Sequence, residues 1–310
     1  MWPRHIPWQQ LRFGVEIEFV GSYPPDLALL GGWSLIHEHE MDDEGREESG
    51  ELISPPLTWA ERGLVREMLA RLRRSPVRAN WDCGTHVHVG IEPWGEAVLS
   101  PLLEAALACQ DALRALVQTT GYRMIYAPYL TAEMVRRHAE LPGEAALRHC
   151  GPPYSQRCGV NAGAWYDKGT VEMRFANGSL AYGEVLRVIR LCLRFVAAVG
   201  AGRSLPGEPA ALAAALGVPV RGYPPPQAPP LWRQKQLWLE DALLPALAPL
   251  ALASTPAAAS FASTRGPRAS ASNWRCRTGT TSGCSAAGGP AAGTRGVCSV
   301  TAGSRIFPGN

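Results

Sequence analysis

Short runs of this chain alternate between apolar and ionisable residues, which is the two-residue period of a β-strand. The ionisable members of three such runs are Glu16 and Glu18 in FGVEIEFVG, His86 and His88 in CGTHVHVG, and Glu172 and Arg174 in GTVEMRFANG. Residues i and i+2 of a strand point to the same face. Each run therefore predicts a strand with one apolar face and one face that carries a pair of ionisable groups.

Such a pair is costly to bury, by several kcal/mol per ion, unless its charges are paired or bound to a metal. Three pairs in one chain therefore predict a single sheet whose open face is a polar, metal-binding site.

The remaining pattern interleaves strands with helices. Besides the strand that contains His86 and His88, strands are predicted at 11–21, 34–39, 51–54, 159–165 and 170–176. The last two are expected to form a hairpin with a turn at 167–169. Helices are predicted from Thr58, from Ser100 to about Thr119, over 131–149 with a break at Pro142-Gly143, over 182–199 and 208–216, and from Leu231. Thr58 and Glu61 have the spacing of a capping box, and Ser100-Pro101 resembles a helix start. The order favours an α+β fold with an antiparallel sheet.

Composition divides the chain into three parts. Residues 1–223 contain all three ionisable pairs and form the predicted folded domain, and 224–253 form a proline-rich linker and a C-terminal helix. Residues 254–310 are mostly Ala, Ser, Gly, Thr and Arg without a single acid, and we predict a disordered tail. This tail is either a natural basic extension or a segment translated out of its ancestral frame.

The charge of the chain excludes some partners. The formal charge is +3, but without the six arginines after residue 253 the chain has 24 basic and 27 acidic residues. No basic stripe indicates nucleic acid, and no apolar stretch reaches the roughly 20 residues that span a membrane. The N-terminus lacks the apolar core of a signal peptide, and the eight cysteines include no CxxC motif. We therefore expect a cytoplasmic protein with reduced thiols.

The carboxylates suggest a hard cation. Glu16 and Glu18 would repel each other on one strand face unless a cation lay between them, and oxygen ligands suit Mg²⁺ or Mn²⁺. Glu51 begins a short strand that Pro55 ends, so its side chain would lie at the rim of the sheet. The alternative is that all three are ordinary surface glutamates.

The remaining candidates could bind a metal or a phosphate. His86 and His88 could do either, although the HxH pattern also occurs in zinc hydrolases. Arg174 would form an ion pair with a carboxylate or bind phosphate, and Asn161 on the neighbouring predicted strand can reach the same face. Arg123 and Arg157 are weaker candidates. Lysine is rare in the chain, which has only Lys168 and Lys235.

Four segments, taken in order, resemble the amidoligase family, a group of COOH–NH₂ ligases in the glutamine synthetase and glutamate–cysteine ligase superfamily. They are FGVEIEFVG, ELISPPLT, CGTHVHVG and TVEMRFANGSL, within residues 11–200. The resemblance implies that residues 1–223 are an amidoligase-like catalytic domain. It further implies a curved antiparallel sheet, with helices on the convex face and with ATP and Mg²⁺ or Mn²⁺ bound on the concave face.

The resemblance also implies roles for individual residues. The implied metal ligands are Glu16, Glu18, Glu51, His86 and Glu172, and Arg174 is implied to contact phosphate. Together with the candidates that the strand pattern provides, we expect His86, His88, Asn161 and Arg174 to bind the cofactor, and Glu16, Glu18, Glu172 and Arg174 to be catalytic. The implied reaction uses ATP to convert a carboxylate into an acyl phosphate, which an amine then attacks. The substrates would be a small molecule or peptide with a carboxylate and an amine acceptor, and a homo-oligomer is compatible with the family. Two alternatives stay open: a zinc metallohydrolase that uses the HxH pair, and a non-catalytic binding module.

Overall fold

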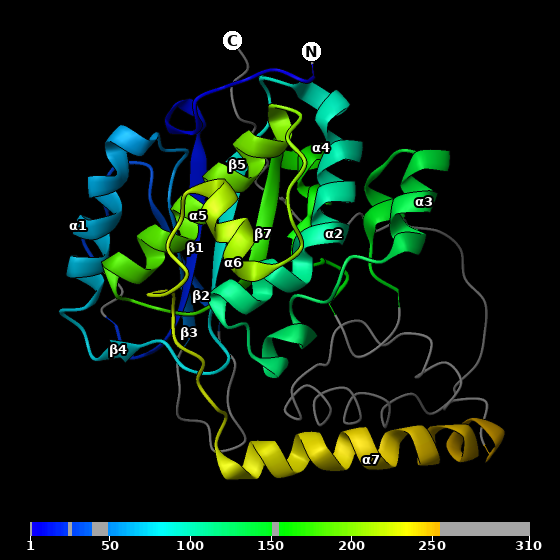
Figure 1. Ribbon diagram of the computed structural model, residues 1–310. Coiled ribbons are helices and arrows are strands. Elements are labelled where there is room, and N and C mark those ends of the chain that lie inside the picture. Colours follow the sequence, from blue (N-terminus) through cyan, green and yellow to red (C-terminus); the bar gives the residue numbers. More distant parts are fainter. Residues whose placement is uncertain (1, 24–26, 39–48, 151–154, 255–310) are drawn as a thin grey trace, which may run out of the picture. The chain divides into compact units, whose positions relative to one another are not determined.

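The computed structural model describes residues 2–23, 27–38, 49–150 and 155–254, and these residues form an antiparallel sheet with helices on one face (Figure 1). Seven strands of the described chain join in the order β2-β3-β1-β5-β7-β6, and β4 pairs with β1 outside this path. All of their pairings are antiparallel. The strands are β1 (Phe13–Gly21), β2 (Ser34–Glu38), β3 (Ser49–Ile53), β4 (Val77–Arg78), β5 (Gly84–Gly90), β6 (Val160–Asn161) and β7 (Thr170–Asn177).

Seven α-helices within the same residues complete the α+β fold. They are α1 (Gly63–Leu72), α2 (Leu99–Val117), α3 (Ala132–Glu140), α4 (Trp165–Lys168), α5 (Tyr182–Gly200), α6 (Pro209–Leu216) and α7 (Leu231–Ser254). Short 3-10 helices lie at Trp8–Gln10, Trp59–Arg62, Gly95–Val98, Gly121–Ile125, Glu144–Leu147 and Ala162–Ala164. None of the helices in the described part is long and apolar enough to cross a membrane.

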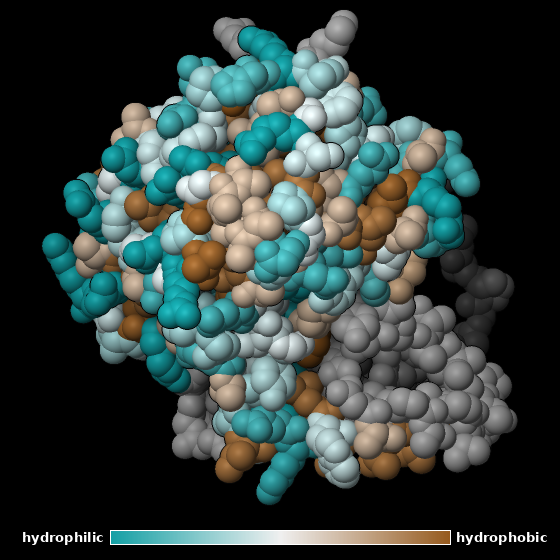
Figure 2. Space-filling view, in the orientation of Figure 1, coloured by the Kyte–Doolittle hydropathy of each residue, from teal (hydrophilic) through white to brown (hydrophobic). Residues whose placement is uncertain are grey.

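The core lies between the sheet and helices α1, α2, α5 and α6. On β1, Val15, Ile17 and Phe19 are fully buried in the same apolar cluster as the inner faces of α2 and α5. The alternate residues of the same strand, Glu16 and Glu18, point to the opposite face, as the two-residue period requires. On the surface of the helix-covered side, hydrophilic and hydrophobic residues are intermixed (Figure 2).

The predicted strand at 159–165 is present only as the short strand β6, which pairs antiparallel with β7 as expected, and the predicted turn at 167–169 is wrong. Only Val160 and Asn161 pair with β7, and the chain then turns into a 3-10 helix and α4. The cause is local, because the Asn161 side chain accepts a hydrogen bond from the backbone N–H of Gly163 and so begins a helical turn. Gly169, with a φ of 67°, then ends α4 and returns the chain to β7.

Of the two predicted helix starts, one is confirmed and the other is wrong. The capping box of Thr58 and Glu61 is present and precedes α1. The predicted cap at Ser100 is wrong, because α2 continues directly from the 3-10 helix Gly95–Val98 and begins at Leu99. Pro101 lies in the first turn of α2, where its missing N–H costs no hydrogen bond. Most of the acidic stretch between β2 and β3, and the tail after residue 254, lie outside the described residues.

Candidate metal and catalytic site

Strand register brings carboxylates from different strands to one histidine. Glu16 on β1 lies directly opposite His86 on β5, and Glu18 on β1 lies opposite Glu51 on β3. All four side chains leave the sheet on the face away from the core. The sequence pattern predicted this face, and the register decides which of its residues meet.

The other half of the site comes from β7. Glu172 lies opposite His88 of β5 on one side and opposite Asn161 of β6 on the other. Asn161 Nδ2 donates to Glu172 Oε2 at 2.8 Å. The polar face therefore carries all eight site residues expected from the sequence: Glu16, Glu18, Glu51, His86, His88, Asn161, Glu172 and Arg174.

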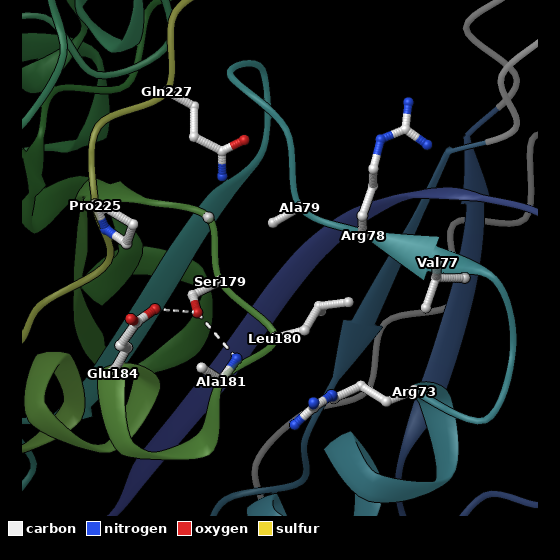
Figure 3. A pocket seen from close by; sticks show the side chains of 11 residues that line it. Arg73, Val77, Arg78, Ala79, Ser179, Leu180, Ala181, Glu184, Pro225 and Gln227 are labelled. Atoms are coloured by element: carbon white, nitrogen blue, oxygen red, sulfur yellow. Dashed lines mark hydrogen bonds between the residues drawn. The ribbon is translucent and has the colours of Figure 1, made fainter.

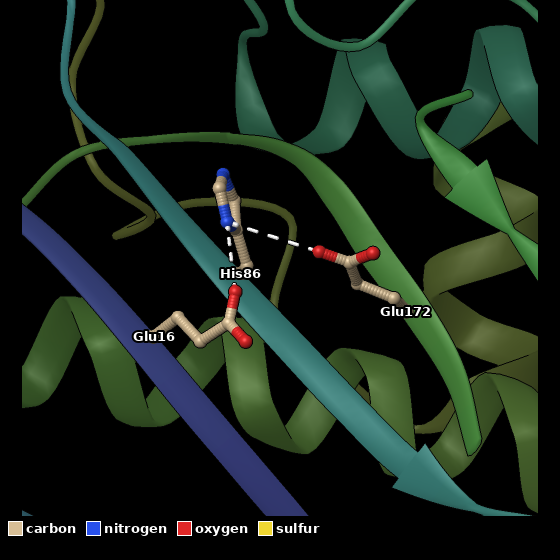
Figure 4. Close-up of side chains that lie close together, drawn as sticks. All are labelled: Glu16, His86 and Glu172. Atoms are coloured by element: carbon tan, nitrogen blue, oxygen red, sulfur yellow. Dashed lines mark hydrogen bonds and ion pairs between the residues drawn. The ribbon is translucent and has the colours of Figure 1, made fainter. Parts of the chain in front are cut away.

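A first cluster, here called the inner group, consists of Glu16, His86 and Glu172 (Figure 4). Nδ1 of His86 lies 3.3 Å from Glu16 Oε2 and 3.9 Å from Glu172 Oε1. His88 borders this group, with its Nε2 3.0 Å from Glu16 Oε1 and 3.7 Å from Glu172 Oε1. The three side chains of the inner group are 2 to 11% exposed.

A second cluster, here called the outer group, consists of Glu18, Glu51 and the same His86. His86 Nε2 lies 3.3 Å from Glu18 Oε1, and His86 Nδ1 lies 3.8 Å from Glu51 Oε1. The backbone N–H of Gly84 also donates to Glu18. The side chains of Glu18 and Glu51 are 26% and 14% exposed, so this group is more open to solvent.

A β-bulge places Arg174 over the inner group. Thr85 pairs with Ala176 and Val87 with Met173, so between these pairs one residue of β5, His86, faces two of β7, Arg174 and Phe175. A bulge bends its strand and re-aims the side chains there. Arg174 Nη1 consequently lies 2.5 Å from Glu172 Oε1 and 3.4 Å from Nδ1 of His86.

Electrostatics keep the inner carboxylates ionised. Burial alone would raise the pKa of Glu172, but the charge of Arg174 and the two histidines lower it to about 2. Burial likewise opposes ionisation of Glu16, and its hydrogen bonds with His86 and His88 outweigh this and hold its pKa well below the usual value. Burial and the nearby charge of Arg174 lower the pKa of His86.

Arg123, which the sequence offered only as a weaker candidate, lies within the site. It enters from the 3-10 helix Gly121–Ile125 and is 1% exposed. Its Nη2 lies 3.2 Å from His86 Nε2, and its Nη1 lies 3.4 Å from Glu18 Oε2 and donates to the Asp82 carbonyl at 2.7 Å. Against the effect of burial, the charges of His86 and Arg123 lower the pKa of Glu18.

Sequence reasoning missed Lys168 and Thr170 as site residues. Lys168 Nζ lies 3.4 Å from Glu16 Oε1, and Thr170 Oγ1 lies 2.9 Å from Nδ1 of His88. Lys168 belongs to the connection that was expected to be an ordinary turn, and Thr170 is the first residue of β7. No pattern in the sequence distinguishes Lys168 from an ordinary turn residue.

A small pocket opens beside the inner group. Its volume is about 190 Å³, and its lining includes His88, Asn161, Lys168 and Glu172, together with Arg157. The space is smaller than the roughly 300–1,000 Å³ of sites for drug-sized ligands. This pocket therefore suits a small molecule next to the carboxylates.

A larger cavity, of about 320 Å³, lies at the start of α5 and next to β4 (Figure 3). Ser179 occupies its wall, where Oγ donates to Glu184 Oε2 at 2.5 Å and accepts from the Ala181 N–H at 2.9 Å. Neither the inner nor the outer group contributes to its lining.

The side chains of the site fit a divalent cation. Each group offers two carboxylates and one imidazole, with ligand atoms within 4.8 Å of one another. Oxygen-rich sets of this kind suit Mg²⁺ or Mn²⁺. The Nε atoms of Arg123 and Arg174 are buried without a hydrogen-bond partner among the described residues, which leaves donors for an anionic ligand.

Fold and site define an α+β protein with a carboxylate–histidine centre on the open face of an antiparallel sheet. The sequence model of the family described as "Putative amidoligase enzyme" matches residues 30–196, more than half of the chain. The chain belongs to this amidoligase family, and that membership indicates a ligase. The match contains Glu51, His86, Glu172 and Arg174, whereas β1 with Glu16 and Glu18 precedes it. No curated protein matches the chain.

Proposed function

We propose that this protein is an ATP-dependent carboxylate–amine ligase that requires Mg²⁺ or Mn²⁺. The observation that carries the proposal is the convergence of four glutamates on His86, with two buried arginines beside them. The membership of the chain in the amidoligase family supports the same reaction class. The proposal includes a glutamine synthetase-like sheet whose polar face binds the nucleotide.

The inner and outer groups would each hold one cation. Bound divalent cations would neutralise phosphate charge and orient the phosphoryl group for transfer. The glutamates would supply anionic oxygens, and His86 would supply its single imidazole lone pair to one of the two groups at a time. Arg174 is placed to contact phosphate oxygens, because its Nε remains available while its Nη1 is bonded to Glu172.

The proposed reaction has two steps. A carboxylate oxygen of the substrate attacks the γ-phosphorus of ATP, and ADP leaves as an acyl phosphate forms. An amine then attacks the acyl carbon, the bond to the phosphate oxygen breaks, and the proton lost by the amine leaves with the phosphate as hydrogen phosphate, so that an amide remains. The substrate carboxylate and the amine are the two nucleophiles, so none from the protein is needed. The arginines would hold the phosphoryl oxygens, and the buried face would exclude water.

The donor sets favour this proposal over a zinc hydrolase. A catalytic zinc site commonly uses several histidines, whereas each cluster found among the described residues has one histidine and two glutamates. His88 hydrogen-bonds to Thr170 and Glu16 and belongs to neither cluster.

Calorimetric titration with Mg-ATP tests the proposal. The wild type is expected to bind Mg-ATP, and the variants Glu16→Gln and His86→Ala are expected to lose this binding because each removes a ligand atom of the inner group. Glu104→Gln is the matched control, since Glu104 is an exposed residue of α2, on the helix-covered side.

Two results would contradict the proposal. Wild-type protein that binds Zn²⁺ tightly and does not bind Mg-ATP would favour the hydrolase. Wild-type protein that binds neither would favour a non-catalytic module.

A further inference from the structure

Lys168 lies between the inner group and the small pocket. Its Nζ is 3.4 Å from Glu16 Oε1, and its side chain is 42% exposed and lines the pocket next to His88 and Glu172. It is the last residue of α4, and Gly169 turns the chain directly into β7. The backbone of Lys168 is therefore fixed close to the site while its ammonium group remains accessible.

The ammonium of Lys168 shares its carboxylate with the inner group. Glu16 contacts Lys168 and His88 through Oε1, and it contacts His86 through Oε2. A cation bound by Glu16 would repel a lysine charge at this distance, because the two positive charges would share one carboxylate.

The two arginines of the site are held more firmly than the lysine. Arg174 forms its 2.5 Å contact with Glu172 and is 9% exposed, and Arg123 is 1% exposed and bonded to the Asp82 carbonyl. Lys168 has one ion pair in the described part of the chain, and its long stem reaches the pocket. It can leave Glu16 without breaking packing in the core.

We propose that Lys168 is a positioning residue that acts as a built-in counter-ion of Glu16 and competes with the divalent cation of the inner group. When the cation is bound by Glu16, the lysine charge is directed toward the pocket, where it favours a substrate with an anionic group. This inference rests on the proposed metal site and deepens it by naming a residue outside the matched motifs that sets its cation affinity.

Mn²⁺ alone is the probe for this inference. Binding is measured by electron paramagnetic resonance of free Mn²⁺, with wild-type protein, Lys168→Met and Lys168→Arg. Lys168→Met keeps the apolar stem and removes the charge, so we expect its Kd for Mn²⁺ to fall about three- to tenfold. Lys168→Arg keeps the charge and is expected to stay within about twofold of the wild type.

Lys235→Met is the matched control, because Lys235 is the other lysine of the chain and is exposed on α7. It is expected to leave the Kd unchanged. A gain in affinity is informative because damage to the fold would weaken binding. Circular dichroism of each variant confirms that it is folded.

The outcomes separate this inference from the proposed function. Unchanged or weaker Mn²⁺ binding by Lys168→Met, with normal binding by the wild type, overturns the role of Lys168 and leaves the metal site intact. Failure of the wild type to bind Mn²⁺ removes the metal site and, with it, this inference.

Discussion

The inner and outer groups use the same histidine but differ in how the protein holds their carboxylates. Glu16 and Glu172 come from β1 and β7, which flank β5, and both are nearly buried. Glu51 comes from β3, on the far side of β1, and its side chain is 14% exposed, close to the 11% of Glu16, whereas Glu18 is 26% exposed. The inner group lies in the middle of the sheet, whereas the outer group extends toward its β2–β3 side.

This difference indicates a division of work between the two groups. Arg174, His88 and Asn161 surround Glu172 with close polar contacts, so the protein fixes the inner carboxylates before any ligand arrives. In the proposed reaction, a cation held by these carboxylates would stabilise the transferring phosphoryl group. In the same proposal the outer group, whose Glu18 side chain is 26% exposed, would bind a cation that enters and leaves with the nucleotide.

The largest expected effect comes from the residue that both groups share. His86→Ala removes the one nitrogen ligand that both groups can use, so we expect Mn²⁺ affinity to fall at least about 100-fold at the group that His86 ligates and to fall less at the other. An electron paramagnetic resonance titration measures both the affinity and the number of bound ions. One ion bound with wild-type affinity would show that His86 serves a single group.

His88→Ala is the comparison for this variant. His88 belongs to neither group, but it contacts Glu16 and Glu172 and so orients the inner carboxylates. We expect the affinity for Mn²⁺ to fall about tenfold at the inner group and to stay unchanged at the outer group.

The faces of the strands could be predicted from the sequence, but their register could not. The alternation around Glu16 and Glu18 predicts which side chains leave the core, and a shift of two residues between strands preserves that pattern. Contacts across the sheet, such as Glu16 with His86, depend on long-range packing. Arg123 and Lys168 lie on short helical turns without a periodic pattern, so nothing in their neighbourhood indicated that they reach the site.

The second expected effect is a loss of unfolding free energy at acidic pH, which arises from Glu172 in the inner group. The pKa of Glu172 is about 2 in the folded protein against an ordinary value of 4.5. A lowered pKa in the folded state stabilises the protein above about pH 4.5, and this contribution is lost as the pH falls toward 2. We expect Glu172 to account for about 2 kcal/mol of the unfolding free energy lost between pH 6 and pH 3.

Urea denaturation at several pH values measures this contribution. Glu172→Gln removes the titrating group, so its unfolding free energy should fall less steeply with acid than that of the wild type. Its absolute stability at pH 7 is expected to be lower, because Arg174 loses its partner, and only the slope tests the prediction. Equal slopes for the two proteins would rule out Glu172 as the source, and Glu104→Gln controls for the loss of one exposed charge.

The smallest expected effect separates the two groups directly. Glu51→Gln removes one carboxylate of the outer group and leaves Glu16 and Glu172 in place. We therefore expect the affinity for Mn²⁺ to fall about tenfold at the outer group and to stay unchanged at the inner group. Glu16→Gln should produce the reverse, because Glu16 belongs to the inner group alone. A two-site Mn²⁺ titration of both variants distinguishes them. Equal losses at both ions in each variant would mean that the ligand atoms of both groups act as one site, and the comparison between an inner and an outer group would have to be abandoned.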